Sequence, residues 1–208
     1  WSGDQRHRGD AVDLVQAVRG NTRADLCDLP PLRIDLKPKR AAQTLFQSRT
    51  ELKLVTQCKA STRYRDYLLL EHKIYQAYNL VTPLSLRTRL VSVTYRDTNG
   101  QIREFTQPAF LIEDLGETAA RLDMERVRRP AMAPSDMDSA QQNLVEIFQY
   151  MIGNTDWSAF LPADGEEFCC HNVKILAPRQ SAAPRGSHIR FLASRSCTSR
   201  IPMSAALP

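Results

Sequence analysis

A carboxylate and two carboxamides in the second half of the chain have the types and order needed for phosphate chemistry. Asn154-Thr155-Asp156-Trp157 directly follows a helical pattern, and His171-Asn172 comes fifteen residues after Asp156. Carboxylate and amide oxygens are hard ligands that suit Mg²⁺ and a phosphate substrate. In such a site, Asp156 accepts a hydroxyl proton and Asn172 holds the metal. The alternative is that Asn-Thr-Asp only builds a turn through local hydrogen bonds.

A second acidic residue, Glu71, falls on the apolar stripe of a predicted helix at 64–80, seven residues from both Tyr64 and Tyr78. A carboxylate that faces a core needs a cationic partner, because an unpaired buried charge costs several kcal/mol. The preceding predicted strand offers Lys37 and Lys39, or less favourably Arg33. Such an ion pair would orient a basic residue toward phosphate, as in protein kinases. The alternative is a Glu at the stripe edge that reaches solvent.

The five cysteines fit neither a zinc signature nor a catalytic cysteine pattern. Cys27 and Cys58 each flank a predicted strand, so they are able to form a disulfide if the protein is exported; buried free thiols are the alternative. Cys169 and Cys170 are adjacent, and His171 has no paired metal-ligand spacing, which favours a structural histidine.

The elements that must position these residues have an α+β pattern. Alternating apolar residues predict strands at 32–37, 51–56 and 86–95, and Asn99-Gly100 predicts a hairpin whose returning strand runs through Ile112. Helical periodicity predicts helices at 64–80 and 139–152, the second ended by Gly153. A charged, Pro-containing connector is expected over 117–137, and a short strand over 172–176.

The net charge of +5 comes from the end of the chain. No Asp or Glu follows Glu167, and removing the six basic residues after residue 173 leaves 1–173 at −1, which excludes a phosphate-backbone footprint and argues against nucleic-acid binding. We expect 1–18 to be an irregular N-terminal segment and 178–208 an irregular basic tail, native or frameshifted. No run of residues is apolar enough to predict a membrane span, and no signal peptide is visible from Trp1 to Asp10.

Taken in order, these motifs resemble the CotH family of spore-coat-type atypical kinases over about residues 19–177, and especially its uncharacterised secreted bacterial members. The matching segments are Arg19-Gly20-Asn21-Thr22-Arg23, the strand 32–37, the helix with Glu71, the hairpin ending in Phe110-Leu111-Ile112-Glu113, Asn154-Thr155-Asp156 and the Cys-Cys-His-Asn string that ends in Asn172. The resemblance implies a divergent protein-kinase-like fold, incomplete at the C-terminal lobe. It also implies an extracytoplasmic location, Mg²⁺ and ATP as cofactors, and phosphate transfer to Ser or Thr of an unknown protein substrate.

By the same resemblance, Asp156 is the catalytic Asp, Asn172 a metal-side Asn, Glu71 the helix Glu that pairs with Lys37, and Glu113 the hinge residue beside the nucleotide base. Two departures matter. Sixteen residues separate Asp156 from Asn172, where ordinary kinases have about four. The family's next Asp-containing metal motif is missing, although His188-Ile189-Arg190-Phe191 could encode Tyr-Asp-Phe in another frame.

We therefore expect this chain to be inactive as written. The second hypothesis is a non-catalytic, pseudokinase-type binding or structural protein of an envelope or coat. A third, a hydrolase that uses Asp156 with Glu113 or Glu166, has no distinguishing motif.

Overall fold

The protein is a mixed α+β structure with two antiparallel sheets and three α-helices among the residues described. The computed structural model describes residues 15–18, 26–37, 39, 42, 46–47, 51–97, 99–179 and 190–193. The α+β class predicted from the sequence is confirmed. None of the described helices is long and apolar enough to cross a membrane.

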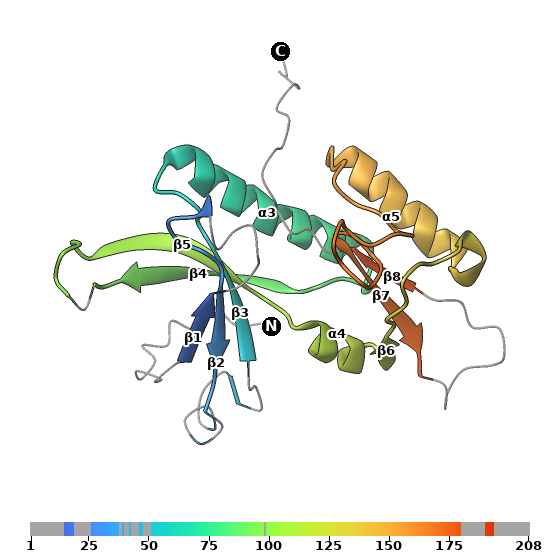
Figure 1. Cartoon of the computed structure of the whole chain (residues 1–208), viewed down its shortest axis with the longest axis horizontal. Helices are drawn as coiled ribbons and strands as arrows, with labels where there is room; N and C mark the ends of the chain where they lie inside the picture. The colour runs from blue at the N-terminus through green and yellow to red at the C-terminus, as the bar shows by residue number, and fades with distance from the viewer. Residues whose placement is uncertain are drawn as a thin grey trace, which may run out of the picture.

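The larger sheet has five antiparallel strands in the order β1-β2-β3-β5-β4 (Figure 1). Their bounds are β1 Val15–Val18, β2 Leu32–Asp35, β3 Glu51–Thr56, β4 Thr88–Tyr95 and β5 Phe105–Ile112. The predicted strands are confirmed, although β2 ends two residues before Lys37. Segment 1–18 was expected to be irregular, and this was wrong for β1, which pairs with β2. Backbone pairing with a neighbour, rather than apolar alternation, forms this strand.

The β4–β5 hairpin is closed by Asp97, whose side chain accepts the backbone N–H groups of Asn99, Gln101 and Ile102. These hydrogen bonds, with that from Asn99 first, lower the pKa of the exposed Asp97 carboxyl. Gly100 has a φ of 69°, the left-handed conformation that favours glycine. The predicted Asn99-Gly100 turn is therefore confirmed.

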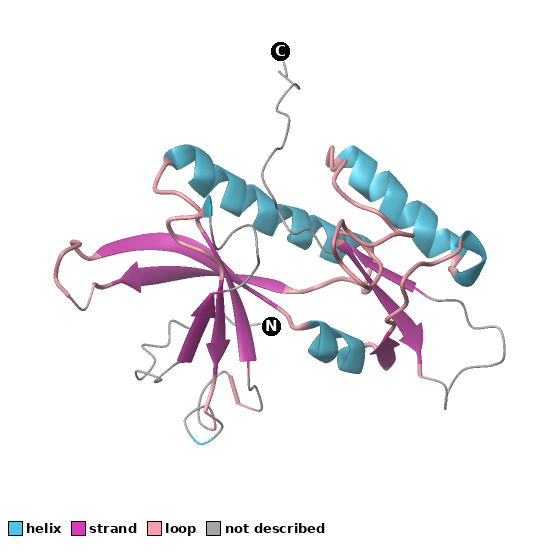
Figure 2. Cartoon of the chain, in the orientation of Figure 1, coloured by secondary structure: helices cyan, strands magenta, loops and turns pink. Residues whose placement is uncertain are grey.

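Helix α3, Thr62–Val81, follows β3 and confirms the predicted helix at 64–80. In Figure 2 it runs along one face of the larger sheet and continues toward the smaller one. Its buried side chains are Leu68, Glu71, His72, Tyr75 and Tyr78. Leu68 and Tyr75 pack in the cluster over the larger sheet and His72 contacts the ring of Phe110, whereas Tyr78 packs with α5 and β7. Helix α3 therefore takes part in the cores of both halves.

The segment predicted as a connector, 117–137, contains more regular structure than expected. It holds most of helix α4, Leu115–Arg121, then strand β6, Met124–Arg126, and the 3₁₀ turn η1, Pro134–Asp136. Asp114 caps α4 by accepting the N–H of Gly116, and Leu115 and Ala119 bury its apolar side. A helix of seven residues is too short to show a clear helical periodicity. The signal in the sequence that indicates this helix is Asp114, a residue type that favours the start of a helix.

The second half contains helix α5, Ser139–Met151, and a three-stranded sheet in the order β6-β7-β8. The α5 prediction is confirmed, and Gly153 follows it at a φ of 63°. Strand β7, Val173–Pro178, confirms the short strand predicted at 172–176. Strand β8, Arg190–Ala193, pairs with β7, so the prediction of an irregular tail was wrong at these four residues.

The buried side chains form three clusters around these elements. One lies between the C-terminal part of α3, α5 and β7, and another lies between α3, β5, α4 and Leu176. The third covers the opposite face of the larger sheet, around Ile34, Leu52 and Leu111. Phe110 is fully buried in the second cluster and contacts the rings of His72 and Tyr75.

Replacing Phe110 by Ala is expected to lower the free energy of unfolding by about 3 to 5 kcal/mol, because it removes a ring that bridges β5 and α3. The matched control is Leu80→Ala on helix α3. Leu80 is 90% exposed, so this substitution should change stability by no more than about 0.5 kcal/mol. Urea unfolding measures both variants. Similar losses in the two would contradict this description of the core.

Candidate functional site

Asp156 and Asn172 come together where the loop after α5 meets the start of β7. The Asn172 amide nitrogen donates to the backbone carbonyl of Asp156 at 2.6 Å and to its carboxylate Oδ2 at 3.1 Å. Asp156 is exposed, whereas Asn172 is 8% exposed. The two residues that the sequence singled out for phosphate chemistry are thus in direct contact despite their separation.

His171 joins this pair and completes a three-residue group, since its Nε2 lies 2.7 Å from Asp156 Oδ1. An ionised carboxylate only accepts hydrogen bonds, so Nε2 carries the proton. The two amide hydrogens of Asn172 are used on Asp156, which makes the 3.2 Å approach of its nitrogen to His171 Nε2 a packing contact. A neutral His171 therefore has its lone pair on Nδ1. The sequence indicated a structural histidine and did not predict the contact of His171 with Asp156. The signal that could have predicted it is the position of His171 next to Asn172, a candidate site residue.

The backbone of Asn172 is left-handed, with a φ of 53°. Asn adopts this conformation at lower cost than most residues other than Gly. The backbone turn and the amide together hold Asn172 against Asp156. The alternative prediction, a turn built by Asn154-Thr155-Asp156, is also present, because the backbone N–H of Asp156 donates to Asn154 Oδ1 at 3.2 Å.

Glu71 is 4% exposed and faces inward from α3, so the alternative of a solvent-reaching side chain was wrong. Lys37, which was proposed from the sequence as its partner, lies beyond the end of β2 and is exposed.

Lys53 on β3 was not predicted as a site residue. It follows Leu52 and precedes Leu54, and strand alternation puts it on the same face as Val55, which packs in the α3 cluster.

Lys53 forms an ion pair with Asp114, the residue that caps α4. Burial works to raise the pKa of the Asp114 carboxyl, but the hydrogen bonds from Lys53 and Gly116, together with the Lys53 charge, hold it below its ordinary value. This contact joins the third strand of the larger sheet to the start of the segment that leads into the smaller one.

Lys174 is the second lysine that faces this junction. Burial lowers its pKa, the positive charges of Arg126 and Lys53 lower it further, and Glu166 works in the opposite direction. In the β6–β7 pairing, Arg126 lies opposite Leu176, so Arg126, Leu176 and Lys174 share one face. Leu176 packs in the same cluster as Val55 and α4, so this face looks toward the larger sheet.

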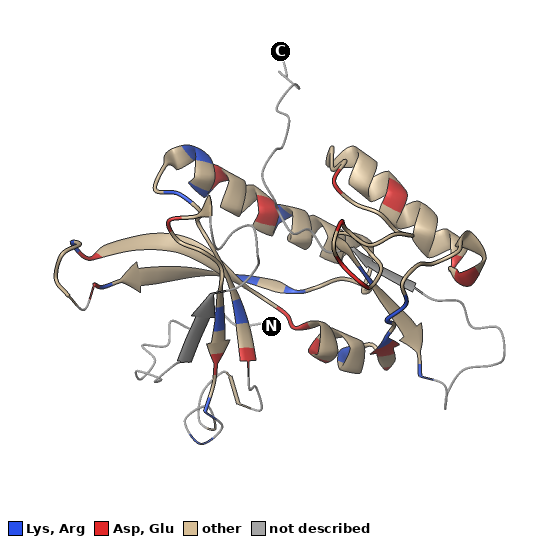
Figure 3. Ribbon diagram, in the orientation of Figure 1, with Lys and Arg blue, Asp and Glu red and all other residues tan. Residues whose placement is uncertain are grey.

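We call Lys53, Arg126 and Lys174 the junction cluster. Figure 3 shows basic residues on β3 and around β6, on the two sides of α4. Burial is the largest cause of the lowered Lys174 pKa, and the charges of Arg126 and Lys53 lower it further. An anion placed among the three residues would oppose the effect of these charges.

Glu113 follows β5 directly, and its carboxylate is already engaged. Arg121 of α4 donates to both of its oxygens, each at 3.0 Å, and the backbone N–H of Arg87 donates to it at 3.1 Å. The same guanidinium reaches the carbonyl of Ser85 at 2.8 Å. The predicted contact of Glu113 with a nucleotide base stays a prediction. Because the carboxylate is occupied, the backbone of Glu113 would have to make that contact.

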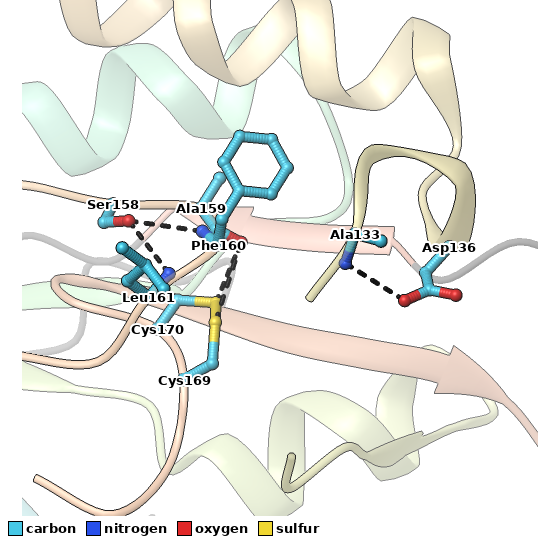
Figure 4. The surroundings of a disulfide bond; sticks show 8 residues. All are labelled: Ala133, Asp136, Ser158, Ala159, Phe160, Leu161, Cys169 and Cys170. Atoms are coloured by element: carbon cyan, nitrogen blue, oxygen red, sulfur yellow. Dashed lines mark hydrogen bonds between the residues drawn. A yellow bond between two sulfur atoms is a disulfide. The ribbon is translucent and has the colours of Figure 1, made fainter. Parts of the chain in front are cut away.

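The cysteines form two disulfides among the described residues. Cys27 pairs with Cys58, as one of the two sequence alternatives proposed. Cys169 and Cys170 are joined to each other, a pairing that was not expected from the sequence. Figure 4 shows both sulfur atoms directed at the carbonyl of Ala159, 3.6 Å from Cys169 and 2.9 Å from Cys170. Ala159 follows Ser158, whose N–H donates to the His171 carbonyl. This pair therefore packs beside the Asp156–His171–Asn172 group.

The Asp156–His171–Asn172 group fits a resident Mg²⁺ ion poorly. Asp156 is its single carboxylate, and both of its oxygens already accept hydrogen bonds from His171 and Asn172. Within the described part of the chain, no three His, Cys, Asp or Glu residues gather closely enough to hold a metal. Asp156, predicted as the base, and Asn172, predicted as a metal ligand, are thus in contact, but the residues around them do not form a complete metal site.

Comparison of the chain with protein-family models, with curated proteins and with solved structures returned no match. The functional assignment therefore has to come from the geometry.

Two substitutions at Asn172 separate its backbone role from its side-chain role. Asn172→Gly should destabilise the fold only through the lost hydrogen bonds to Asp156, whereas Asn172→Ala should lose about 1 to 2 kcal/mol more, because Ala resists a left-handed backbone. Urea unfolding compares them. Equal stability of the two variants would contradict the backbone geometry described.

The Lys53–Asp114 pair makes a pH-dependent contribution. Because the folded pKa of Asp114 lies below its unfolded value, the stabilisation is present above about pH 4 and is lost as the pH falls through the folded pKa. Lys53→Met should cost about 1 to 3 kcal/mol at pH 7, and the cost should shrink in acid. Lys59→Met, at an exposed lysine, is the control. A cost independent of pH between 2 and 7 would refute the coupling.

Proposed function

We propose that this chain is a kinase-like domain that binds ATP through its phosphates, and that its parent protein transfers phosphate from ATP to Ser or Thr of a protein substrate. The supporting observation is the junction cluster. The charge of Lys53 in the larger sheet acts on Lys174 in the smaller one, and Lys174 lies two residues after Asn172, which contacts Asp156. A phosphate chain among these lysines would lie near the carboxylate proposed as the base.

The order of elements supports the same proposal. In protein kinases, a lysine on the third strand of an antiparallel sheet pairs with a glutamate on the helix that follows. Here Lys53 lies on β3 and buried Glu71 on α3, between β3 and β4. Lys53 therefore replaces Lys37 as our candidate for the phosphate-binding lysine. Glu113 and Asp114 then form the short connection between the two halves.

The residues of this chain can bind and orient, but they do not complete the chemistry. Asp156 would accept the hydroxyl proton of the substrate, His171 would orient its carboxylate, and Asn172 would fix the loop. Mg²⁺ would neutralise phosphate charge in such a reaction, and the donor set described above does not fit it. We therefore propose a chain that binds nucleotide and is inactive as written.

Binding of ATP to the whole chain tests the proposal. ATP at one hundred times its dissociation constant should raise the free energy of unfolding by about 2.7 kcal/mol. Lys174→Met should weaken binding by about tenfold or more, since it removes a charged partner of phosphate. Lys73→Met, at an exposed lysine of α3, should leave binding unchanged. Calorimetric titration gives the affinities, and absence of ATP binding to the folded wild-type chain would refute the proposal.

The catalytic role belongs to the parent protein. In a full-length, frame-corrected relative, radiolabelled phosphate transfer from ATP should be lost when the residue matching Asp156 is changed to Ala. Unchanged transfer would remove Asp156 from the mechanism while leaving nucleotide binding by the junction cluster untouched.

A second candidate function is a non-catalytic binding or structural component of an envelope or coat. It is favoured by the lack of a complete metal site among the described residues. This hypothesis predicts no stabilisation by ATP with or without Mg²⁺. An extracytoplasmic location suits both candidates, because the Cys27–Cys58 disulfide is typical of an oxidising compartment.

A further inference from the structure

The Cys169–Cys170 disulfide lies in the loop that leads directly into His171 and Asn172. Cys170 is 2% exposed and belongs to the cluster between α3, α5 and β7, whereas Cys169 is half-buried and packs against that cluster. The backbone N–H of Cys169 donates to the carbonyl of Arg129 at 2.8 Å, which ties the loop to the segment after β6. One cysteine of the pair is therefore part of the core, and the other lies at its edge.

The carbonyl oxygen of Ala159 is the group that both sulfur atoms face (Figure 4). Cys170 Sγ lies 2.9 Å from this oxygen and Cys169 Sγ lies 3.6 Å from it. Ala159 is 3% exposed, and within the described part of the chain no N–H or O–H group donates to its carbonyl. A disulfide sulfur carries no hydrogen, so the oxidised pair leaves a buried acceptor without a donor.

Reduction of the pair supplies the missing donor. A thiol S–H group is a weak hydrogen-bond donor, and Cys170 Sγ is already within reach of the Ala159 carbonyl. Buried carbonyl groups are nearly always paired, and leaving one unpaired is unfavourable. The surroundings of Cys170 therefore favour the dithiol over the disulfide.

Reduction also frees the backbone beside the Asp156–His171–Asn172 group. A disulfide between adjacent residues closes a small ring that contains their peptide unit, so it restricts the backbone angles of both residues. His171 follows this ring directly. Its N–H donates to the carbonyl of Leu161 at 3.1 Å, and its carbonyl accepts the N–H of Ser158 at 3.0 Å. These two hydrogen bonds join the loop after Asp156 to the segment that carries Asn172.

We propose that the Cys169–Cys170 pair is a redox-sensitive switch. The disulfide holds His171 and Asn172 against Asp156, and reduction by a protein dithiol loosens this contact. The importance of the switch for phosphate transfer rests on the proposed function, whereas the redox change and the loosening do not.

The dithiol reductant balances the exchange. One of its thiolates attacks Cys169 Sγ at the edge of the core, the S–S bond breaks, and Cys170 Sγ leaves with the bonding electrons and takes a proton from solvent. The second thiolate of the reductant then displaces Cys169 Sγ, which is protonated in turn. One disulfide and one dithiol thus give two cysteine thiols and a disulfide in the reductant. The new Cys170 thiol lies beside the Ala159 carbonyl.

Titration of the whole chain with mixtures of reduced and oxidised dithiothreitol tests the redox step. Thiols are blocked with N-ethylmaleimide and located by peptide mass spectrometry, in a Cys197→Ser background so that the fifth cysteine does not exchange. Cys27–Cys58 is the internal control. Cys169–Cys170 should be half-reduced at a ratio of reduced to oxidised reagent at least about tenfold lower, because its dithiol gains a buried hydrogen bond.

Hydrogen exchange measures the loosening. When this pair is reduced and the other disulfide is intact, the amides of Ser158 and His171 should exchange about tenfold faster, which corresponds to the chain entropy removed by closing so short a loop. The side-chain amide resonances of Asn172 should shift at the same time. The control is the amide of Thr82, which donates to the carbonyl of Tyr78 at the end of α3 and should keep its exchange rate.

A variant with Cys169→Ser and Cys170→Ser forms no disulfide and should show the faster exchange with or without dithiothreitol. The proposal is overturned if the wild-type pair is reduced only together with Cys27–Cys58 or after it, or if exchange at Ser158 and His171 does not respond to reduction. Neither measurement involves ATP, so a chain that binds no ATP would refute the proposed function and leave the switch standing.

Discussion

The ion pair between Glu113 and Arg121 is the interaction on which the arrangement of the two halves depends. Arg121 binds both carboxylate oxygens at the end of β5 and also reaches the carbonyls of Ser85 and Pro83 in the loop after α3. Glu113 is almost fully buried, so losing its partner would leave a buried charge uncompensated. One guanidinium thus fixes the larger sheet, α3 and α4 relative to each other. It also fixes the entry into β6 and the smaller sheet.

That arrangement brings charges together that are far apart in the sequence. Lys53 comes from β3, Arg126 from β6 and Lys174 from β7; burial lowers the pKa of Lys174 most, and the charges of Arg126 and Lys53 lower it further. Asp114 compensates part of this charge through Lys53. Lys174 lies on β7, which begins directly after Asn172. A polar site at the junction of two sheets is the physical basis of the proposal that the chain binds a nucleotide through its phosphates.

The sequence predicted the long helices and strands and the two residues, Asp156 and Asn172, that come together. It did not predict two short strands or the role of Lys53. Period-two alternation and helical stripes located β3, α3 and α5, and the burial of Glu71 followed from its place on a stripe. Strands β1 and β8 were missed because their four-residue segments lack the period-two alternation that marked β2, and their pairing with β2 and β7 is not visible in the sequence. Lys53 was overlooked because a lysine within an alternating strand is ordinarily assigned to solvent. Its partner Asp114 lies sixty-one residues away, beyond the reach of local patterns.

The junction cluster is the central claim, and the titration of Lys174 tests it most directly. Nuclear magnetic resonance of the lysine side chains, recorded as a function of pH with and without ATP, follows this single group in the folded protein. If phosphate lies among Lys53, Arg126 and Lys174, the pKa of Lys174 must rise on addition of ATP, because an anion stabilises its charged form. A depressed pKa that stays unchanged at saturating ATP would contradict the account.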